Sequence, residues 1–356
     1  MNDILEDKAN TSLSEFGEFG LIDYLTKNIK IKNKSTILGV GDDAAIIDTQ
    51  KRYQVVSTDL LVEGIHFDMH YCPLKHIGYK AIASNLSDVA AMNARPEQVL
   101  VSIAVSSRFT VETIAEMYEG MYACCERYGV DLVGGDTTSS LSGLFISVTV
   151  LGYADKKNIV KRSTANENDL ICVSGDLGSA YMGLLILERE KQVFLKNPDM
   201  QPDLDTFSYI LERQLKPEPR LDIVESLEKL NILPTSMIDV SDGLASEILH
   251  ICKKSDKGCV IYEDKLPIDT STYSTALDFG LAPSTAALNG GEDYELLFTV
   301  KQDDYEKIQQ MPDISVIGYI TEKNSGCSLI TQDNQSTELT AQGWDVYKKD
   351  NHADKQ

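Results

Sequence analysis

Aspartate residues gather in five short clusters, each at or beside the end of an apolar segment of the chain. The clusters are Gly41-Asp42-Asp43, Ser57-Thr58-Asp59, Asn85-Leu86-Ser87-Asp88, Gly134-Gly135-Asp136-Thr137-Thr138 and Asp239-Val240-Ser241-Asp242-Gly243. Carboxylates on a solvated face are usually interspersed with lysines, whereas these have small and apolar neighbours. Carboxylates buried together repel one another and lose hydration, so they need a positive partner. A divalent cation is the natural candidate.

Hard carboxylate and hydroxyl oxygens select Mg²⁺, Mn²⁺ or Ca²⁺ over softer metals. Mg²⁺ in particular is usually held by a few carboxylates together with substrate phosphates. The clusters therefore indicate phosphate chemistry. Any single aspartate could equally form a turn or cap a helix, because Asp is favoured at both positions. The recurrence of five clusters favours the metal interpretation.

Two of the clusters have a predicted structural setting. Residues 134–138 follow an expected strand at 130–133, so the glycines would let the backbone approach a ligand while Asp136 and the hydroxyls face a cation or phosphate. Alone, that segment would be a tight turn. Asn85 and Asp88 interrupt the buried stripe of an expected helix over residues 73–92, which indicates either a site or a satisfied buried polar pair.

Three further residues could contact a ligand, and each has a plainer alternative. His66, in Gly64-Ile65-His66-Phe67, is either a structural hydrogen-bonding residue or a substrate contact. Arg162 lies in a polar connection, where it is either solvated or a phosphate clamp. Glu292 follows a glycine pair and either caps that turn or faces a ligand.

The elements that must position these residues alternate between strands and helices. In the first half, strands are expected at residues 40–47, 53–58, 98–106 and 144–153, and helices at 73–92 and 111–128. After a polar connection at 154–169, strands are expected at 170–174, 294–300 and 315–320, with helices after Gly178 and Asp242. The pattern predicts an α/β fold with domains at 1–153 and 154–347, followed by a disordered tail at 348–356.

Composition narrows the class of protein. The 356 residues are 42% hydrophobic, enough for two domains with separate cores. A net charge of −22 argues against nucleic-acid binding, which normally needs clustered Lys and Arg. The seven cysteines have no C-x-x-C spacing and predict free thiols in a reducing compartment. An acidic N-terminus and the lack of a long apolar run predict a cytoplasmic protein without membrane contact.

Motifs that the sequence lacks limit the mechanism. The sequence contains no G-x-x-x-x-G-K-[ST] P-loop, no H-R-D and D-F-G pair, and no G-x-G-x-x-G dinucleotide fingerprint. If ATP is a substrate, it is bound in another way.

The motifs, taken in order, resemble the thiamine-monophosphate kinase family from about Glu18 to Tyr347. The matching segments are EFGLIDYL, GVGDDAA, VVSTDLLVEGIHF, YKAIASNLSDVAAM, LVGGDTT, KRSTA, IDVSDGL and NGGEDYELLFTV. The GDD, GGD and DGL blocks are shared loosely with the wider superfamily of aminoimidazole-ribonucleotide synthetase. The combination of STD with GIHF, NLSD and GGEDYE is what resembles the thiamine enzymes.

The resemblance implies a two-domain aminoimidazole-ribonucleotide synthetase-like fold. The N-terminal sheet would pair with its copy in a homodimer to form a shared β-barrel, and the C-terminal α/β domain would cover the site. Several magnesium ions would be bound by Asp43, Ser57, Thr58, Asp59, Asp88, Asp136, Asp239 and Asp242. ATP would contact Gly135, Asp136, Arg162 and Ser241. Thiamine monophosphate would contact His66, Glu292 and Trp344, the last by stacking on a cationic thiazolium or a pyrimidine.

The implied reaction is direct in-line transfer of the γ-phosphoryl group of ATP to the phosphate of thiamine monophosphate, giving thiamine diphosphate and ADP. The acceptor is already an ionised oxygen, so no acid or base residue and no phospho-enzyme intermediate are expected. Two alternatives stay open: another ATP-dependent enzyme of the superfamily, and a non-catalytic acidic metal-binding protein. A selenophosphate synthetase is disfavoured, since it should carry a reactive Cys near its start and the first cysteine here is Cys72.

Two segments depart from the family pattern: the residues before Glu15 and the charged stretch 188–214, which is longer than usual. Neither contains a motif, and both leave partner surfaces open.

Overall fold

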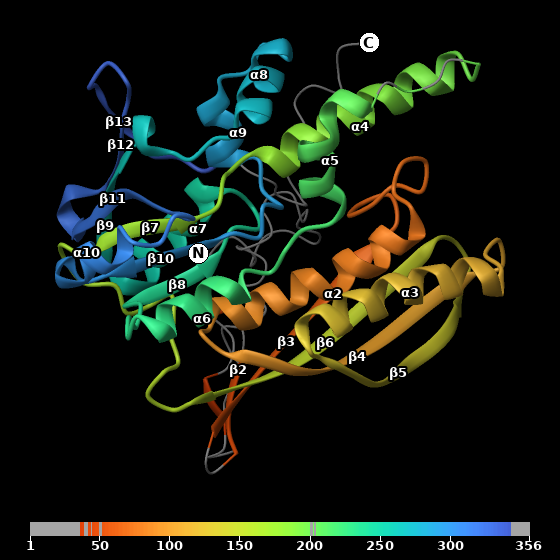
Figure 1. Cartoon of the computed structure of the whole chain (residues 1–356), viewed down its shortest axis with the longest axis horizontal. Helices are drawn as coiled ribbons and strands as arrows, with labels where there is room; N and C mark the ends of the chain where they lie inside the picture. The colour runs from red at the N-terminus through yellow and green to blue at the C-terminus, as the bar shows by residue number, and fades with distance from the viewer. Residues whose placement is uncertain are drawn as a thin grey trace, which may run out of the picture. The chain divides into compact units, whose positions relative to one another are not determined.

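Two mixed β-sheets, each packed against helices, make up the part of the chain that the computed structural model describes (Figure 1). The structure describes residues 36–38, 42–43, 45–49, 52–199, 202 and 204–342. All of them belong to one unit, Ser35–Gly343. The predictions for Trp344 and for the tail at 348–356 fall outside the described residues. The α/β class expected from the sequence is confirmed.

The first sheet has the strand order β1-β2-β3-β6-β4-β5. Its strands are β1 (Thr36–Leu38), β2 (Ala45–Asp48), β3 (Arg52–Val62), β4 (Arg95–Ser106), β5 (Asp131–Ser140) and β6 (Leu144–Asp155). Neighbours are antiparallel except β4 and β5, which are parallel. Val99, Val101 and Ile103 of β4 are buried while Leu100 is 36% exposed, as the period of two along a strand requires.

The helices α2 (Leu74–Ala91) and α3 (Val111–Tyr128) lie side by side over the buried face of this sheet (Figure 1). The Thr110 hydroxyl accepts the Thr113 N–H at the start of α3, and Gly129 ends it with φ 65°. A Cβ on Gly78 would lie 1.9 Å from the Met117 carbonyl oxygen, so glycine allows the two helices to approach closely. Both helices were predicted from the sequence.

The second sheet has the order β13-β12-β9-β11-β7-β10-β8. Its strands are β7 (Leu170–Ser174), β8 (Ser236–Asp239), β9 (Lys257–Tyr262), β10 (Leu296–Val300), β11 (Ile314–Glu322), β12 (Cys327–Ile330) and β13 (Ser336–Glu338). The associated helices are α4 (Ser179–Lys196), α5 (Ser208–Leu215), α6 (Leu221–Lys229), α7 (Leu244–Ser255), α8 (Thr270–Asp278), α9 (Pro283–Asn289) and α10 (Tyr305–Ile308). No helix among the described residues is long and apolar enough to cross a membrane.

Helices bury both faces of the second sheet. Ile171 and Val173 of β7 pack in one core with α7 and α9, while Cys172 packs in another core with α6 and α10. A strand that is buried on both faces has a continuous run of apolar residues. This is why β7 and β10 could be predicted as strands from the sequence.

Helix α2 packs against both sheets. Ile82 and Leu86 belong to the core of the first sheet, whereas Ala90 and Ala91 belong to a core that includes Ile223 of α6. The residues between these two groups are therefore held where the sheets meet. Asp88 lies in that stretch.

Two sequence-based expectations need correction. The strand expected at 130–133 is longer than predicted, because β5 runs on through residues 134–138 as the edge strand paired with β4, which also excludes a tight turn there. The strand expected at 40–47 is replaced by β1 and β2, with residues 39–41 and 44 outside the described part. Within the charged stretch 188–214, the described residues include the end of α4, a short 3-10 helix and most of α5.

Candidate functional site

Three buried or half-buried carboxylates come together from three distant segments. Asp43 precedes β2, Asp88 lies on α2, and Asp239 ends β8 of the second sheet. Each offers one oxygen, and these oxygens lie within 4.8 Å of one another. Asp59 of β3 is close enough to repel the charge of Asp88. We call Asp43, Asp59, Asp88 and Asp239 the carboxylate group; both sheets contribute to it.

Burial dominates the titration of the carboxylate group. It raises the pKa of Asp43 to about 8, with repulsion from Asp239 and Asp42 adding to it and the positive charge of Arg162 opposing it. Burial and the charge of Asp239 raise the pKa of Asp59 to about 6. The pKa of Asp88 lies well above its ordinary value, first through burial and then through its carboxylate neighbours. Ionised, these groups need a cation.

Two serine hydroxyls support the carboxylates. Ser57 Oγ donates to Asp88 Oδ2 at 2.6 Å, and Ser87 Oγ donates to Asp239 Oδ2 at 2.6 Å. The second bond links α2 to the second sheet. Thr58 faces the other side of β3, where its hydroxyl donates to the Val148 carbonyl at 3.0 Å. Successive side chains on a strand point to opposite faces, so Thr58 is separated from the carboxylate group.

Arg162 is the positive partner of the acidic pair at residues 42–43. Its Nε lies 3.2 Å from Asp42 Oδ1, and its guanidinium also binds both oxygens of Asp43. The backbone N–H of Arg162 donates to Asp42 as well. The arginine side chain is 13% exposed, so it is not part of a solvated linker.

The loop at residues 239–243 is held by a buried glutamate. Glu247, in the first turn of α7, accepts the backbone N–H of Ser241 at 3.2 Å and of Asp242 at 2.8 Å. Burial, followed by the charge of Asp242, raises the pKa of Glu247 well above its ordinary value. Gly243 has φ 110°, a conformation that L side chains rarely adopt. The loop therefore has one fixed shape.

Glu292 binds a buried lysine. Its Oε1 lies 2.9 Å from Nζ of Lys80 on α2, and its Oε2 accepts from Gln214 Nε2 at 2.7 Å. Its backbone N–H donates to the Ser241 carbonyl at 2.7 Å, although φ is 58° at this residue. The turn that contains Glu292 is thus fastened to the loop at 239–243.

His66 lies within electrostatic range of the Glu292–Lys80 pair. Its Nδ1 accepts the Val62 N–H at 3.0 Å, which leaves Nε2 to carry the ring proton in the neutral form. Burial lowers the pKa of His66, the charge of Glu292 opposes this shift, and the charge of Lys80 adds to it. The histidine is neutral near pH 7.

Two predicted site residues lie away from this group within the chain. Gly135 and Asp136 are on β5, three strand positions from β3, a distance of about 14 Å at the usual strand spacing. A Cβ on Gly135 would lie 1.7 Å from the Val101 carbonyl oxygen, so packing against β4 already requires glycine there. Asp136 is exposed.

Besides Glu247, three residues at the site were not singled out from the sequence. Ser87 and Lys80 lie on α2 and bind Asp239 and Glu292 from distant segments. Tyr294 is the third: burial raises its pKa well above the ordinary value, and Glu292 and the carboxylate group raise it further. The sequence held one indication of these residues: Lys80 is a charged residue within the apolar part of the helix around Ile82.

The carboxylate group fits Mg²⁺. Its ligand atoms are carboxylate oxygens with serine hydroxyls beside them, and Mg²⁺ prefers such hard oxygens. When ionised, the carboxylates that converge from both sheets carry negative charge that is not fully compensated. The softer metals favoured by imidazole or thiolate have no such ligands among the described residues of this group.

The sequence and the structure both match known proteins. The family models for the N-terminal and C-terminal domains of AIR synthase related protein match residues 41–154 and 166–328. "Thiamine-monophosphate kinase" of Bacillus subtilis is 37% identical over 340 residues, covering 93% of this chain and 99% of the relative. The protein of the same name from Synechococcus elongatus is 35% identical, over 88% of this chain and 92% of the relative.

Among solved structures, one described as "AaThiL complexed with AMPPCP and TMP" has a TM-score of 0.80 at 30% identity, covering 95% of this chain and all of the other. The hydrogenase maturation protein HypE of Escherichia coli has a TM-score of 0.62 at 19% identity, covering 81% of this chain and 85% of the other, a likeness of fold alone.

Proposed function

Because this chain belongs to the thiamine-monophosphate kinase family, with the two domains of AIR synthase related proteins, we propose that it transfers the γ-phosphoryl group of ATP to thiamine monophosphate with the help of several Mg²⁺ ions. The products are thiamine diphosphate and ADP. The chain is an enzyme, a kinase with a phosphate group as acceptor.

The observation that carries the proposal is the convergence of Asp43, Asp88 and Asp239, whose oxygens lie within 4.8 Å of one another. Both substrates of the proposed reaction are anionic at the reacting phosphates, and mutual repulsion is the main obstacle to their approach. A site with concentrated carboxylates would repel them further unless cations are bound. The group therefore makes sense as a magnesium site that faces phosphates.

In this proposal the ions are held by the carboxylate group together with Ser57, and Asp242 contributes from the loop at 239–243. The residues of the carboxylate group are Asp43, Asp59, Asp88 and Asp239. Mg²⁺ bound there supplies positive charge to the phosphate oxygens of both substrates. Thr58 and Asp136, also implied by the resemblance, have side chains outside the carboxylate group. Their roles stay predictions from family likeness.

Arg162 and Ser241 are proposed to contact ATP. Arg162 is paired with both Asp42 and Asp43 in the metal-free chain, and a guanidinium is also a good bidentate partner for phosphate. If a cation were bound to Asp43, Arg162 would be available to contact a phosphate. The acceptor phosphate is already ionised, so the reaction needs no general base. The aspartates with raised pKa values are therefore not assigned the role of removing a proton.

His66, Glu292 and Trp344 are proposed to contact thiamine monophosphate. His66 lies within electrostatic range of Glu292, which supports a shared role, and the Lys80 partner fixes the position of the glutamate carboxylate. A carboxylate beside a neutral imidazole suits a cationic heterocycle better than a phosphate. Trp344 enters this proposal through the resemblance.

The proposal is tested by incubating the purified chain with ATP, Mg²⁺ and thiamine monophosphate and separating the nucleotides and thiamine phosphates by chromatography. We expect thiamine diphosphate and ADP in equal amounts, and neither product when Mg²⁺ is replaced by a chelator. ATP consumption with some other acceptor would favour another enzyme of the superfamily. Metal binding without ATP turnover would favour the non-catalytic alternative.

We also propose that residues 1–153 and 154–347 form the two domains and that the first sheet pairs with a second copy to form a barrel. The face of this sheet opposite α2 and α3 supports pairing, because it exposes Leu60 at 54% and Val133 at 56%. Light scattering during gel filtration should give twice the mass of one chain. A monomeric mass would contradict the pairing and leave the proposed reaction intact.

A further inference from the structure

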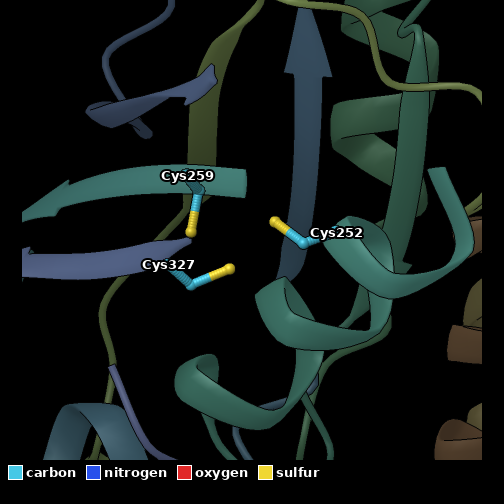
Figure 2. A group of neighbouring side chains, drawn as sticks. All are labelled: Cys252, Cys259 and Cys327. Carbon is cyan, nitrogen blue, oxygen red and sulfur yellow. The ribbon is translucent and has the colours of Figure 1, made fainter. Parts of the chain in front are cut away.

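Three cysteines that are scattered in the sequence meet at one place in the second sheet. The Sγ atoms of Cys252, Cys259 and Cys327 lie within 4.8 Å of one another, and the three side chains point toward a common centre (Figure 2). All three are free thiols. The sequence predicts free thiols, and the lack of C-x-x-C spacing gives no sign that they meet, so the grouping is produced by the fold.

The backbone fixes two of the cysteines as neighbours. Cys259 of β9 and Cys327 of β12 are direct partners in the parallel ladder, which places their side chains on the same face of the sheet. The Cys259 N–H donates to the Gly326 carbonyl at 3.1 Å. A Cβ on Gly258 would lie 2.2 Å from that same carbonyl oxygen, so glycine is required for the strands to approach here.

Helix α7 brings the third cysteine over this face. Cys252 lies in the last turns of α7, and Ile248 and Ile251 of the helix pack in the same core as Cys259 and Ile261. Cys252 is 2% exposed and Cys259 is fully buried, whereas Cys327 is half-buried at the rim of the core. The three sulfurs therefore face one another from a helix and two strands, with access from the Cys327 side.

We propose that Cys252, Cys259 and Cys327 form a zinc site with three thiolate ligands and a fourth position open to water on the side of Cys327. Zinc bound to sulfur at about 2.3 Å in a tetrahedral arrangement places the sulfurs about 3.8 Å apart. The observed grouping needs a contraction of about 1 Å at most to reach that spacing. Side-chain rotation can supply it.

Charge and ligand type select zinc over the other candidates. Thiolates are soft ligands, so Mg²⁺ from the carboxylate group would not compete for them. Three thiolates leave one negative charge around Zn²⁺ and two around Cu⁺, and the buried surroundings favour the smaller net charge.

The zinc site is separate from the carboxylate group. Leu244 and Cys252 are about 12 Å apart along α7 at 1.5 Å per residue, and the loop at 239–243 precedes the helix at its other end. Zinc would fasten the C-terminal end of α7 to β9 and β12. The inference does not rest on the proposed function, because it requires no substrate.

Titration of the metal-stripped, reduced full chain with Zn²⁺, and separately with Co²⁺, tests the site in the presence of excess Mg²⁺ to occupy the carboxylates. We expect one tightly bound Zn²⁺ per chain by elemental analysis and thiolate-to-cobalt charge-transfer absorption with Co²⁺. Oxygen ligands cannot produce that absorption. Zn²⁺ should also raise the melting temperature.

Cys327→Ser is the main variant, because its half-buried position tolerates a hydroxyl, and Cys252→Ser is the second. Each should weaken Zn²⁺ binding by more than the about 10–100-fold that loss of an outer-shell partner costs, and should abolish the zinc-dependent rise in melting temperature. Cys125→Ser, on α3 in the first sheet's core, is the matched control and should bind Zn²⁺ like the wild type.

Absence of the charge-transfer band, or unchanged Zn²⁺ affinity in Cys327→Ser, would overturn the site. Thiol counting on the air-exposed protein gives an independent result. If two of the three cysteines form a disulfide in air, and reducing that disulfide back to thiols does not increase Zn²⁺ binding, the zinc site would also be overturned.

Discussion

Asp88 is half-buried on α2 with Asp43, Asp59 and Asp239 around it, and its hydrogen-bond partner is Ser57. Its negative charge is useful to the protein only when a cation is present. The same charge is a cost to the metal-free fold, because burial and repulsion both penalise it.

Replacing Asp88 by Asn separates these two effects. We expect phosphoryl transfer to fall by on the order of 100-fold or more, since one cation ligand is lost, while the melting temperature of the metal-free protein stays the same or rises. Kinetics at saturating Mg²⁺ and a melt in chelator measure the two quantities. A large loss of metal-free stability would identify Asp88 as a structural residue instead.

Glu292 allows a second test at the residue scale, because it has a structural partner in Lys80. Glu292→Gln leaves the buried ammonium without its counter-charge. We expect a loss on the order of 1–2 kcal/mol, less than the about 3–5 kcal/mol of a fully buried pair, because the Glu292 side chain is 30% exposed.

The double variant Lys80→Met, Glu292→Gln should recover the stability but not the affinity for thiamine monophosphate, which KM reports. Recovery of both would show that Glu292 acts through folding alone. Val55→Ala, a change in the core that the first sheet shares with α2, controls for nonspecific destabilisation.

Side-chain type was easier to predict than side-chain direction. The clusters at Asp43, Asp88 and Asp239 were visible because acids beside apolar runs are conspicuous, and the structure brings these three together. Thr58 was grouped with Ser57 and Asp59 by adjacency, although a strand alternates its faces. Ser87 could not be predicted as a partner of Asp239, since that contact spans 152 residues of sequence.

At the scale of elements, β5 is the strand whose length was underestimated. Glycines and polar residues at 134–138 are typical of a turn, and an edge strand needs little apolar sequence because one side is unpaired. The ladder with β4 nevertheless continues from Asp131 to Ser140, and Gly135 lies against the Val101 backbone. Helices α2 and α3 were predicted well, since their caps and apolar spacing are local signals.

The neighbouring glycines Gly134 and Gly135 form a matched pair for testing this packing. A Cβ on Gly135 meets the Val101 carbonyl oxygen at 1.7 Å, whereas a Cβ on Gly134 has its nearest neighbour at 3.9 Å, on Leu100. Gly135→Ala should destabilise the protein by about 1–3 kcal/mol, and Gly134→Ala by less than about 0.5 kcal/mol, in denaturant unfolding.

The same pair distinguishes packing from an ATP contact. If Gly135→Ala unfolds like the wild type but raises KM for ATP, the family-based role of Gly135 is correct and the packing explanation fails.

At the scale of the whole described unit, the carboxylate group is also a junction. Asp43 and Asp88 belong to the first sheet and its helix, while Asp239 belongs to the second sheet, and α2 packs in the cores of both. Repulsion between ionised members of the group would push the sheets apart, and a cation bound there, as proposed above, would draw them together. This coupling could not be predicted from sequence, because it depends on how α2 is shared.

The coupling predicts a distinctive dependence of stability on pH. The folded pKa of Asp43 is about 8 and that of Asp59 is about 6, both above the ordinary value of 3.8, so the folded metal-free protein retains protons that the unfolded chain releases. The stabilisation is complete below about pH 3.8 and is lost as pH rises through the folded pKa values. The lowered pKa of His66 acts in the opposite sense.

Melting temperatures in chelator should therefore fall by several °C between pH 5 and pH 8, and the fall should be smaller in Asp88→Asn. Mg²⁺ should raise the melting temperature strongly at pH 8 and little at pH 5, because protonated carboxylates bind it poorly and stabilisation follows its affinity for the folded state. If the metal-free protein is equally stable at both pH values, or Mg²⁺ stabilises it equally at both, the carboxylate group is not the source of the coupling between the two sheets.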